Sequence, residues 1–470
     1  MTSGPIPLDP RYRDRYWVLL TAGVATFMSA LDGSVVNTVL PVIAKEFGSN
    51  LASIEWVVTV YLLVLSGLLL SFGRLGDIRG QKRVFQLGFL LFLAGSALSG
   101  LSDSTVMLIV FRAFQALGGA MLSASSPAIL TKNFPAKQRG QALGLQATLT
   151  YLGLTIGPSF GGWLADQLSW RAVFYINVPV AIAAFLLTLR FVPADPPSEG
   201  AEEFDRPGAL LFLAGLVALL LALNQGPTWG WGSLPVLALF ALSFVLLGAF
   251  LHLEQSLAGP MLDLSLFRSR LFSASTGAAV ANYACVYCVL FLLPFYLIDG
   301  KGLTPGAAGL LLMAEPLVMA IIAPLSGTLS DRVPTWIPST FGMGVLAGGL
   351  FLLSRLGAAS TQLAVVVALA VSGFGIGAFI SPNSSALMGS APANRQGIAA
   401  GMLATARNVG MVLGVGFGGA VYTTVLVRAG GGSAALFTAI RTSFLAAVGV
   451  ALLGVILSSV RAVRDDSREG

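Results

Sequence analysis

Three ionisable residues, Asp32, Arg112 and Glu315, lie well inside long apolar runs of this sequence. An ionised carboxylate near the centre of a bilayer costs about 2.5–3.5 kcal/mol on insertion scales, so such residues usually face a bundle interior and mark a pathway. Asp32 and Arg112 lie at a comparable depth from the same end of their runs. We expect the two to pair, and Asp32 to act either in proton coupling or only as a structural partner of the arginine.

Glu315 is followed directly by Pro316 in a third apolar run. A carboxyl group in an apolar setting can hold a proton near neutral pH, and a proline inside a helix frees a backbone carbonyl and favours a kink. Glu315 is therefore expected to be a proton or substrate residue, or else the ion-pair partner of Arg407, which lies in a later run.

Polar and aromatic side chains of the same runs are candidates for a substrate cavity. The face of an aromatic ring attracts a cation, so such rings can hold a lipophilic cation, although core packing is equally consistent with them. The candidate cavity residues are Asn37, Tyr61, Gln115, Asn282, Tyr283, Tyr287, Phe291, Arg407 and Asn408.

Composition places these runs in a membrane. Of the 470 residues, 56% are apolar and only 10% are charged, and the mean hydropathy is +0.83, so there are too few charges to cover a soluble surface. A helix needs about 20 apolar residues to cross a bilayer. The sequence holds fourteen such stretches, the first of which is expected to be retained rather than cleaved: 16–43, 54–73, 84–101, 105–131, 141–166, 172–191, 207–224, 234–254, 271–298, 306–330, 337–355, 361–389, 397–427 and 440–462.

Basic residues are distributed unequally between the two sides of these spans. With both termini placed inside, 19 Lys and Arg residues fall on the inner side and six on the outer side, while Arg112 and Arg407 lie within spans. Such an excess marks the cytoplasmic side. We expect a multi-pass protein of the plasma (inner) membrane with both termini in the cytoplasm. The net charge of +6 reflects this topology and not nucleic-acid binding.

The glycine-rich basic stretch Gly73–Arg83 has a weaker copy at Gly327–Arg332. Both read Gly-x-Leu-x-Asp, and their offset is 254 residues. Ser-Pro, Leu-Pro and four-glycine patterns recur at offsets of 255, 253 and 257 residues, so the chain consists of two related halves. We read the first stretch as a turn in which Asp77 caps the next helix. The expected gating residues are Gly73, Asp77, Arg83, Gly157, Pro158 and Asp331.

The repeat and the hydropathy together divide the chain. Residues 207–254 have no copy in the repeat and are expected to lie away from the cavity. The predicted parts are a cytoplasmic tail (1–15), an N-terminal six-helix bundle (16–191), a cytoplasmic linker (192–206), two extra transmembrane helices (207–254), a second cytoplasmic linker (255–270), a C-terminal six-helix bundle (271–462) and a cytoplasmic tail (463–470).

Other polar residues have simpler interpretations. Cys285 and Cys288 share a Cys-x-x-Cys spacing, but in an apolar helix they are expected to pack rather than to bind metal or form a disulfide. His252, the single histidine, is expected at the membrane interface, with a proton relay as the alternative. Glu55 is expected at the outer rim of its span, with recruitment of cations as the alternative. No catalytic triad or phosphate-binding loop pattern occurs, so we expect no enzyme and no cofactor besides the proton gradient.

Three of these motifs are similar to signatures of the major facilitator superfamily: Gly73–Arg83, Arg112 with Gln115 and Gly118, and Gly157-Pro158-x-x-Gly161-Gly162. The Gly-Pro motif resembles that of its proton-coupled antiporters. The runs Leu31–Pro41 and Trp170–Pro179 resemble the fourteen-helix drug:proton antiporter branch, and the likeness covers nearly the whole chain.

The resemblance implies an all-α membrane protein in which two six-helix bundles surround a central cavity and alternate between inward-open and outward-open states. It implies that Asp77 helps to lock the bundles together on the cytoplasmic side, and that the acid of the first span and the arginine of the fourth, Asp32 and Arg112, belong to coupling. The two helices of 207–254 would be the additional pair of the fourteen-helix branch.

We therefore expect a proton-coupled exporter of amphipathic, cationic drugs or toxic compounds, with protons and membrane lipids as further partners and a monomeric state. Three alternatives remain. The same fold could export a lipid, siderophore or specialised metabolite; it could import a small solute, against which the Gly-Pro motif argues; or the chain could be a membrane receptor or enzyme, which its short loops disfavour.

Overall fold

The structure, a computed structural model, describes residues 14–135, 138–194, 205–256, 264–330, 332–390 and 396–459. Asp331 of the expected gating set lies outside these ranges, as do most of both tails and parts of both predicted linkers. For Asp77 the backbone is described and the side chain is not.

Every regular element in the described ranges is helical. Several helices begin at a residue whose side chain accepts a backbone N–H, as Asn50 does from the Ser53 amide at 2.9 Å. In chain order the elements are α1 (Arg15–Glu46), α2 (Leu51–Arg79), α3 (Gln81–Gly100), α4 (Thr105–Asn133), α5 (Arg139–Gln167), α6 (Ala172–Tyr175), α7 (Asn177–Phe191), α8 (Arg206–Trp229), α9 (Leu234–Ser256), the 3₁₀ turn η3 (Leu264–Arg268), α10 (Arg270–Phe295), the π turn η4 (Tyr296–Gly300), α11 (Pro305–Leu312), α12 (Ala314–Ser330), α13 (Trp336–Ser354), α14 (Gln362–Ser390), α15 (Gln396–Arg428) and α16 (Ser433–Ser459).

Thirteen helical segments of the described chain are long and apolar enough to cross a membrane. The less apolar α5, 29 residues long, packs along α1 and makes the fourteenth. Two predicted spans are interrupted: the sixth divides into α6 and α7 at Ile176, and the tenth divides into α11 and α12 at Met313. The fourteen predicted spans thus all correspond to helices, but two of them are not continuous.

The turn within Gly73–Arg83 is much shorter than the sequence predicted, because most of this stretch is helical. Helix α2 continues through it as far as Arg79, α3 starts at Gln81, and only Gly80 connects them. Gly80 has φ = 93°, a value that residues with a Cβ rarely adopt. Asp77 lies inside α2, so it cannot be the N-cap of α3, a position that Gly80 occupies.

The two halves repeat the same packing. In the first half, α1 packs on α5, α3 on α4 and α2 on α4; in the second, α10 packs on α15, α13 on α14 and α12 on α14. The glycine faces match as well: a Cβ at Gly157 of α5 would collide with Ser34 of α1, and one at Gly414 of α15 would collide with the Ala284 carbonyl of α10. Small residues allow such close helix approach in membranes.

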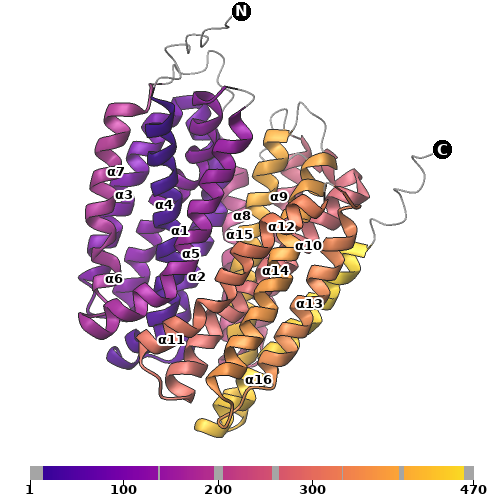
Figure 1. Ribbon diagram of the computed structural model, residues 1–470. Helices are drawn as coiled ribbons and strands as arrows, with labels where there is room; N and C mark the ends of the chain where they lie inside the picture. Colours follow the sequence, from indigo (N-terminus) through magenta and orange to yellow (C-terminus); the bar gives the residue numbers. More distant parts are fainter. Residues whose placement is uncertain are drawn as a thin grey trace, which may run out of the picture.

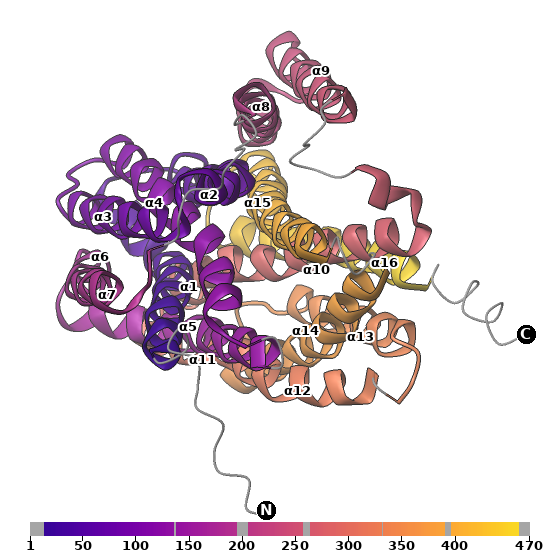
Figure 2. The same ribbon diagram turned by 90° about the horizontal axis from the view of Figure 1, so that it is seen from above.

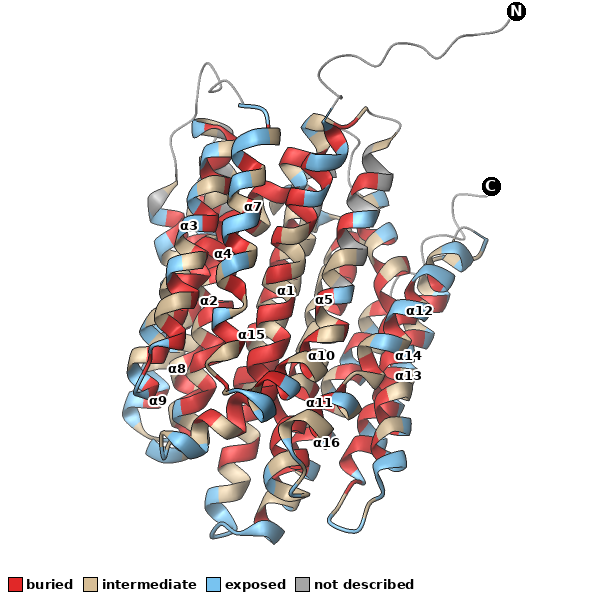
Figure 3. Ribbon diagram, turned by 60° about the vertical axis from the view of Figure 1, so that its left-hand side comes forward, coloured by how far each residue is buried: buried red, intermediate tan, exposed pale blue. Residues whose placement is uncertain are grey.

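The start of α1 and the end of α16 lie on the same side of the molecule, which we call the terminal side; the opposite side is the far side (Figure 1). The two halves converge near α11 on the far side, where α5 contacts α11 and α2 contacts α15. Helices α8 and α9 stand outside both halves, with α8 against α2 and α15 (Figure 2). Helix α1 is buried along most of its length between its neighbours (Figure 3).

Candidate functional site

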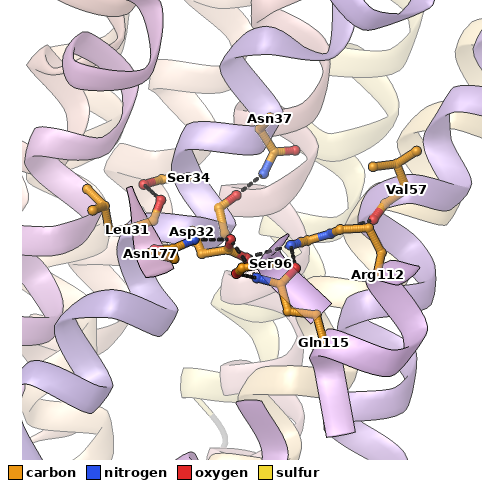
Figure 4. A network of polar contacts seen from close by, with 10 residues as sticks. Leu31, Asp32, Ser34, Asn37, Val57, Ser96, Arg112, Gln115 and Asn177 are labelled. Atoms are coloured by element: carbon orange, nitrogen blue, oxygen red, sulfur yellow. Dashed lines mark hydrogen bonds and ion pairs between the residues drawn. The ribbon is translucent and has the colours of Figure 1, made fainter. Parts of the chain in front are cut away.

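A buried polar network surrounds Asp32 in the first half (Figure 4). Arg112 Nη1 donates to Asp32 Oδ2 at 2.6 Å, and both side chains are at most 1% exposed. The predicted pairing of these two residues is confirmed. Removing one partner of a buried ion pair leaves an uncompensated charge, so each residue fixes the charge state of the other.

Neutral donors complete the shell of the carboxylate. Gln115 Nε2 donates to Asp32 Oδ1 at 3.0 Å and to Ser96 Oγ at 2.6 Å, and Asn177 Nδ2 donates to Asp32 Oδ1 at 2.9 Å. The interruption at Ile176 makes Asn177 the first residue of α7. Asn177 and Ser96 were not among the predicted site residues. The only signal for Asn177 was its place in the Trp170–Pro179 run, where an asparagine gives no indication of its partner.

Two aromatic rings enclose the guanidinium of Arg112. Its Cζ lies 4.1 Å from the centre of the Tyr61 ring and 5.7 Å from that of Phe174, and its Nε donates to the Val57 carbonyl at 3.3 Å. Cation–π contacts of this kind hold a cation in a site without water. Tyr61 therefore contacts the ion pair with its ring.

Tyr61 also lines the larger of two adjoining cavities between the halves, of about 250 Å³. From the second half, Tyr283, Tyr287, Arg407 and Asn408 line it. Arg407 Nε and Asn408 Nδ2 are buried and have no hydrogen-bond partner among the described residues. Five of the nine predicted cavity residues thus meet at one space, two of them with unused donors.

Glu315 lines the second cavity, of about 60 Å³, whose other lining side chains are almost all apolar. The two cavities share Leu154, Tyr283, Tyr287 and Met411. Glu315 is 7% exposed and makes no ion pair with Arg407, so the alternative of a Glu315–Arg407 pair is not realised in this state. It lies two residues beyond the interruption at Met313, where α11 gives way to α12.

Four of the predicted cavity residues do not line either cavity. Asn37 Nδ2 turns back to the Gly33 carbonyl at 2.6 Å, and Asn282 faces α13, with its Nδ2 3.4 Å from Met343 Sδ. Phe291 is fully buried with its ring against Phe295, and Gln115 belongs to the Asp32 network. Asn37 and Phe291 thus contact residues of their own helices, and Asn282 and Gln115 contact neighbouring helices, so none of the four side chains lines the space between the halves.

The Gly-Pro motif of α5 faces the second half. A Cβ at Gly309 of α11 would collide with the Pro158 carbonyl, and one at Gly162 would collide with the Pro305 carbonyl. The Gly306 amide donates to Asp166 Oδ2 at 2.8 Å. Gly157 and Pro158 thus belong to the helix that closes the far side, whereas Gly73 meets no neighbour and Arg83 is exposed.

The remaining polar residues take no part in this site. Cys285 and Cys288 are buried free thiols, and Cys285 lies against the Ala447 carbonyl of α16. His252 is exposed on α9, the outer helix of the extra pair. None of the residues that line the two cavities comes from α8 or α9.

Known proteins resemble this chain along most of its length. It is 35% identical over 450 residues to the riboflavin transporter RibZ of Clostridioides difficile, covering 95% of this chain and 97% of that protein. It is 33% identical over 410 residues to the multidrug resistance protein Stp of Mycobacterium tuberculosis, covering 87% and 76%. It is 32% identical over 403 residues to the tetracenomycin C resistance and export protein of Streptomyces glaucescens, covering 86% and 75%.

Solved structures share the fold at low sequence identity. A bacterial homologue of the lysosomal transporter Spinster, in an inward-facing and occupied conformation, matches with a TM-score of 0.68 at 15% identity over 97% of both chains. The peptide transporter POT in complex with sulfate matches with a TM-score of 0.67 at 18% identity, over 95% of this chain and 94% of that one. The family model described as Major Facilitator Superfamily matches residues 22–415 and, overlapping it, 276–469. With two repeated halves, a cavity between them and this match, the chain is a member of the Major Facilitator Superfamily.

Proposed function

We propose that this protein exports amphipathic, cationic drugs or toxic compounds in exchange for protons by alternating access. The observation that carries the proposal is the placement of Tyr61, which lines the central cavity and also stacks on Arg112 of the Asp32 network. A substrate in the cavity contacts Tyr61, and a proton on Asp32 alters the ion pair with Arg112, on which Tyr61 stacks. Both ligands can therefore affect the position of Tyr61. Coupling requires only that the two ligands bind the two states of the protein differently.

Glu315 is the proposed contact for the cationic end of the substrate. Its carboxylate is the one acid that lines the two cavities in the described part of the chain. The Tyr283 and Tyr287 rings border both cavities and offer their faces to a flat cation. A proton and a cation compete for this carboxylate, so binding one displaces the other.

The cycle follows from the ion pair. In the present state the halves meet on the far side, and Asp32 is paired with Arg112. When the far side opens, a proton from that side neutralises Asp32 and Glu315 and displaces the substrate. A protonated Asp32 holds Arg112 less tightly, which favours closure, and opening of the terminal side then releases the proton and exposes the carboxylates to the next cation.

The finer assignments belong to the same proposal. The terminal side is the cytoplasmic side of the plasma membrane, because the basic residues are concentrated there. The chain belongs to the fourteen-helix drug:proton antiporter branch and works as a monomer, with the proton gradient as its only energy source. Relatives named for multidrug resistance and for tetracenomycin C export support an export function.

A second candidate function is export of a specialised metabolite that carries hydrogen-bond acceptors. Arg407 and Asn408 line the larger cavity, and one donor atom of each, Arg407 Nε and Asn408 Nδ2, is buried without a hydrogen-bond partner among the described residues. A donor left unpaired in a buried site favours a ligand with an acceptor. A flat, polycyclic compound with carbonyl or hydroxyl groups fits this chemistry. The similarity to a riboflavin transporter favours the same class.

Transport in proteoliposomes tests the main proposal. An imposed pH gradient is expected to drive ethidium against its own concentration gradient with wild type, and Glu315→Gln is expected to lose most of this uptake. Asp103→Asn, which changes an exposed far-side acid, serves as the control and should behave as wild type. Ethidium movement that ignores the pH gradient would contradict proton coupling, and riboflavin movement without ethidium movement would favour the second candidate.

A further inference from the structure

Glu55 lies near the far-side end of its span, where the sequence predicted a residue of the rim, but its side chain is buried. It lies in the second turn of α2 on the far side and is 2% exposed. A carboxyl group is taken out of water at this depth only with a partner or a proton, so its surroundings decide which of the two it has.

Three helices meet at the Glu55 carboxyl. On one side lies Gly419 of α15, where a Cβ would collide with Glu55 Oε2. On the other lies Asn224 of α8, whose Nδ2 is 3.4 Å from Glu55 Oε2 and donates more closely, at 2.8 Å, to the Ala52 carbonyl. The carboxyl thus fills the contact between the two halves, and α8 covers it from outside.

No described basic side chain neutralises Glu55. The two arginines of α15, Arg407 and Arg428, lie 12 and nine residues from Gly419, roughly 18 and 14 Å along the helix. Arg112 of α4 contacts the opposite face of α2, at Val57 and Tyr61.

The other groups around the carboxyl are uncharged. The α8 side chains that face this junction are the amides Asn224 and Gln225, which are hydrogen-bonded to each other at 3.1 Å. The nearest titratable residue of α15 is the buried Tyr422. The contact therefore suits a neutral carboxyl and opposes an ionised one.

The internal repeat gives this contact a counterpart. Gly419 of α15 is the copy of Gly162 of α5. Gly162 packs against the backbone of α11, which belongs to the second half, and Gly419 packs against the Glu55 carboxyl, which belongs to the first half. The two contacts between halves are thus equivalent in position, but they differ in their acids: the carboxyl at the α2–α15 contact, Glu55, is buried, whereas that at the α5–α11 contact, Asp166, is exposed and accepts from the Gly306 amide.

The geometry points to Glu55 as a proton-binding site of the far-side gate, separate from the substrate cavity: a proton on Glu55 allows α2 to close on Gly419 of α15, and its loss opens this contact. The inference rests on the alternating-access cycle proposed above. Protons abundant on the far side would then themselves favour closure after they have been taken up. Helix α8, tied to α15 also by Trp231 Nε1 and Thr424 Oγ1 at 3.2 Å, keeps the carboxyl away from lipid and supplies its only described hydrogen bond.

Spin-label distances across the gate test this inference. Labels at Ser53→Cys on α2 and Val427→Cys on α15, both exposed positions, would be placed in the full-length protein with Cys285 and Cys288 changed to alanine. In wild type the short-distance population should dominate near about pH 5.5 and give way to a long-distance population near about pH 8.5. Glu55→Gln, which keeps the shape and stays neutral, should hold the short distance throughout, with a closed-to-open ratio roughly tenfold above wild type at the alkaline end.

Two further variants separate this site from the substrate site. Asp103→Asn should keep the wild-type response, and Glu315→Gln should lose proton-coupled transport while keeping the pH-dependent distance change. A response retained in Glu55→Gln would overturn the inference. A wild-type distance distribution that does not change with pH would also overturn the inference. This test does not depend on whether any Glu55 variant folds. Failure of transport in every assay with an intact, Glu55-dependent distance change would overturn the proposed export function and leave the gate site standing.

Discussion

The Asp32 carboxylate accepts hydrogen bonds from three side chains on two other helices: Arg112 and Gln115 of α4 and Asn177 of α7. Only one of the three is charged. A hydrogen bond to a charged group contributes about 1.5–3 kcal/mol, so the two neutral donors help to hold the carboxylate in its position beside Arg112.

Asn177→Ala removes one of these donors without touching the ion pair. The Asp32 carboxylate is then held by one donor fewer and is less firmly placed beside Arg112, so the rate of pH-driven ethidium transport should fall roughly 10-fold. Initial rates of ethidium uptake under an imposed pH gradient measure this loss. Asn37→Ala is the matched control, since Asn37 is equally buried in α1 but bonds only to its own helix; equal losses in both variants would show that Asn177 does not act through Asp32.

Arg407→Gln distinguishes the two candidate substrate classes. Loss of the Arg407 guanidinium, whose Nε has no hydrogen-bond partner among the described residues, removes a charge-assisted hydrogen bond from any ligand that carries an acceptor, which should weaken binding of a flavin-like compound roughly 10- to 100-fold. Ethidium, a cation, should bind as well as before or better. Quenching of intrinsic tryptophan fluorescence reports both affinities, and a large loss for ethidium alone would contradict the placement of its charge near Glu315.

At the scale of the elements, the far-side seal rests on glycine. Helix α11 leaves the line of α12 at Met313 and lies against α5, with Gly309 on the Pro158 carbonyl. Glu315 lies at the start of α12, so an acid of the cavity adjoins the break between α11 and α12. The Gly-Pro motif of α5 thus has a structural partner, the Pro305-Gly306-x-x-Gly309 run.

Gly309→Ala should open this seal. The added Cβ meets backbone, which cannot move aside, and such overpacking costs about 1–3 kcal/mol. A cysteine at Leu290, in a background without Cys285 and Cys288, should therefore react at least about fivefold faster with an impermeant thiol reagent applied from the far side. Gly344→Ala in α13 is the control, because nothing lies within 4 Å of its Cβ position; unchanged labelling in Gly309→Ala would show that α11 does not close the far side.

The sequence predicted the helices and the central ion pair for a physical reason. A charge in an apolar span must be paired, and the depth of Asp32 and Arg112 in their spans matched. It did not predict the position of Asn177, because a neutral asparagine carries no comparable constraint and its partner lies 145 residues away. It did not predict that Glu55 is buried, because the docking of α8 against α2 and α15 follows from no periodic pattern in the sequence. The turn predicted for Gly73–Arg83 is confined to Gly80, because α2 continues to Arg79 and α3 begins at Gln81.

At the scale of the whole molecule, two repeated halves meet on the far side and the extra pair α8–α9 flanks one of their two junctions (Figure 2). The Asp32 network lies inside the first half, the cavities lie between the halves, and Glu55 lies at the junction that α8 covers. The cavities and the Glu55–Gly419 contact are formed by both halves, whereas the Asp32 network lies within the first half and adjoins the larger cavity through Tyr61.

The orientation of the molecule can be measured with two cysteines. Asp103→Cys lies on the far side after α3, and Arg332→Cys lies on the terminal side after α12; both positions are exposed. If the terminal side is cytoplasmic, an impermeant maleimide should label only Asp103→Cys in intact cells and both variants after permeabilisation. The reverse pattern would contradict the orientation inferred from the basic residues.

Proton flux on addition of substrate tests the central claim of proton-coupled export most directly. Purified protein would be reconstituted in vesicles with a pH-sensitive dye, and ethidium would be added to wild type, Asp32→Asn, Glu315→Gln and the control Asp103→Asn. We predict that ethidium releases protons with wild type and the control, and that Asp32→Asn and Glu315→Gln both lose the response. Wild-type protein that moves ethidium without any proton flux would contradict the account.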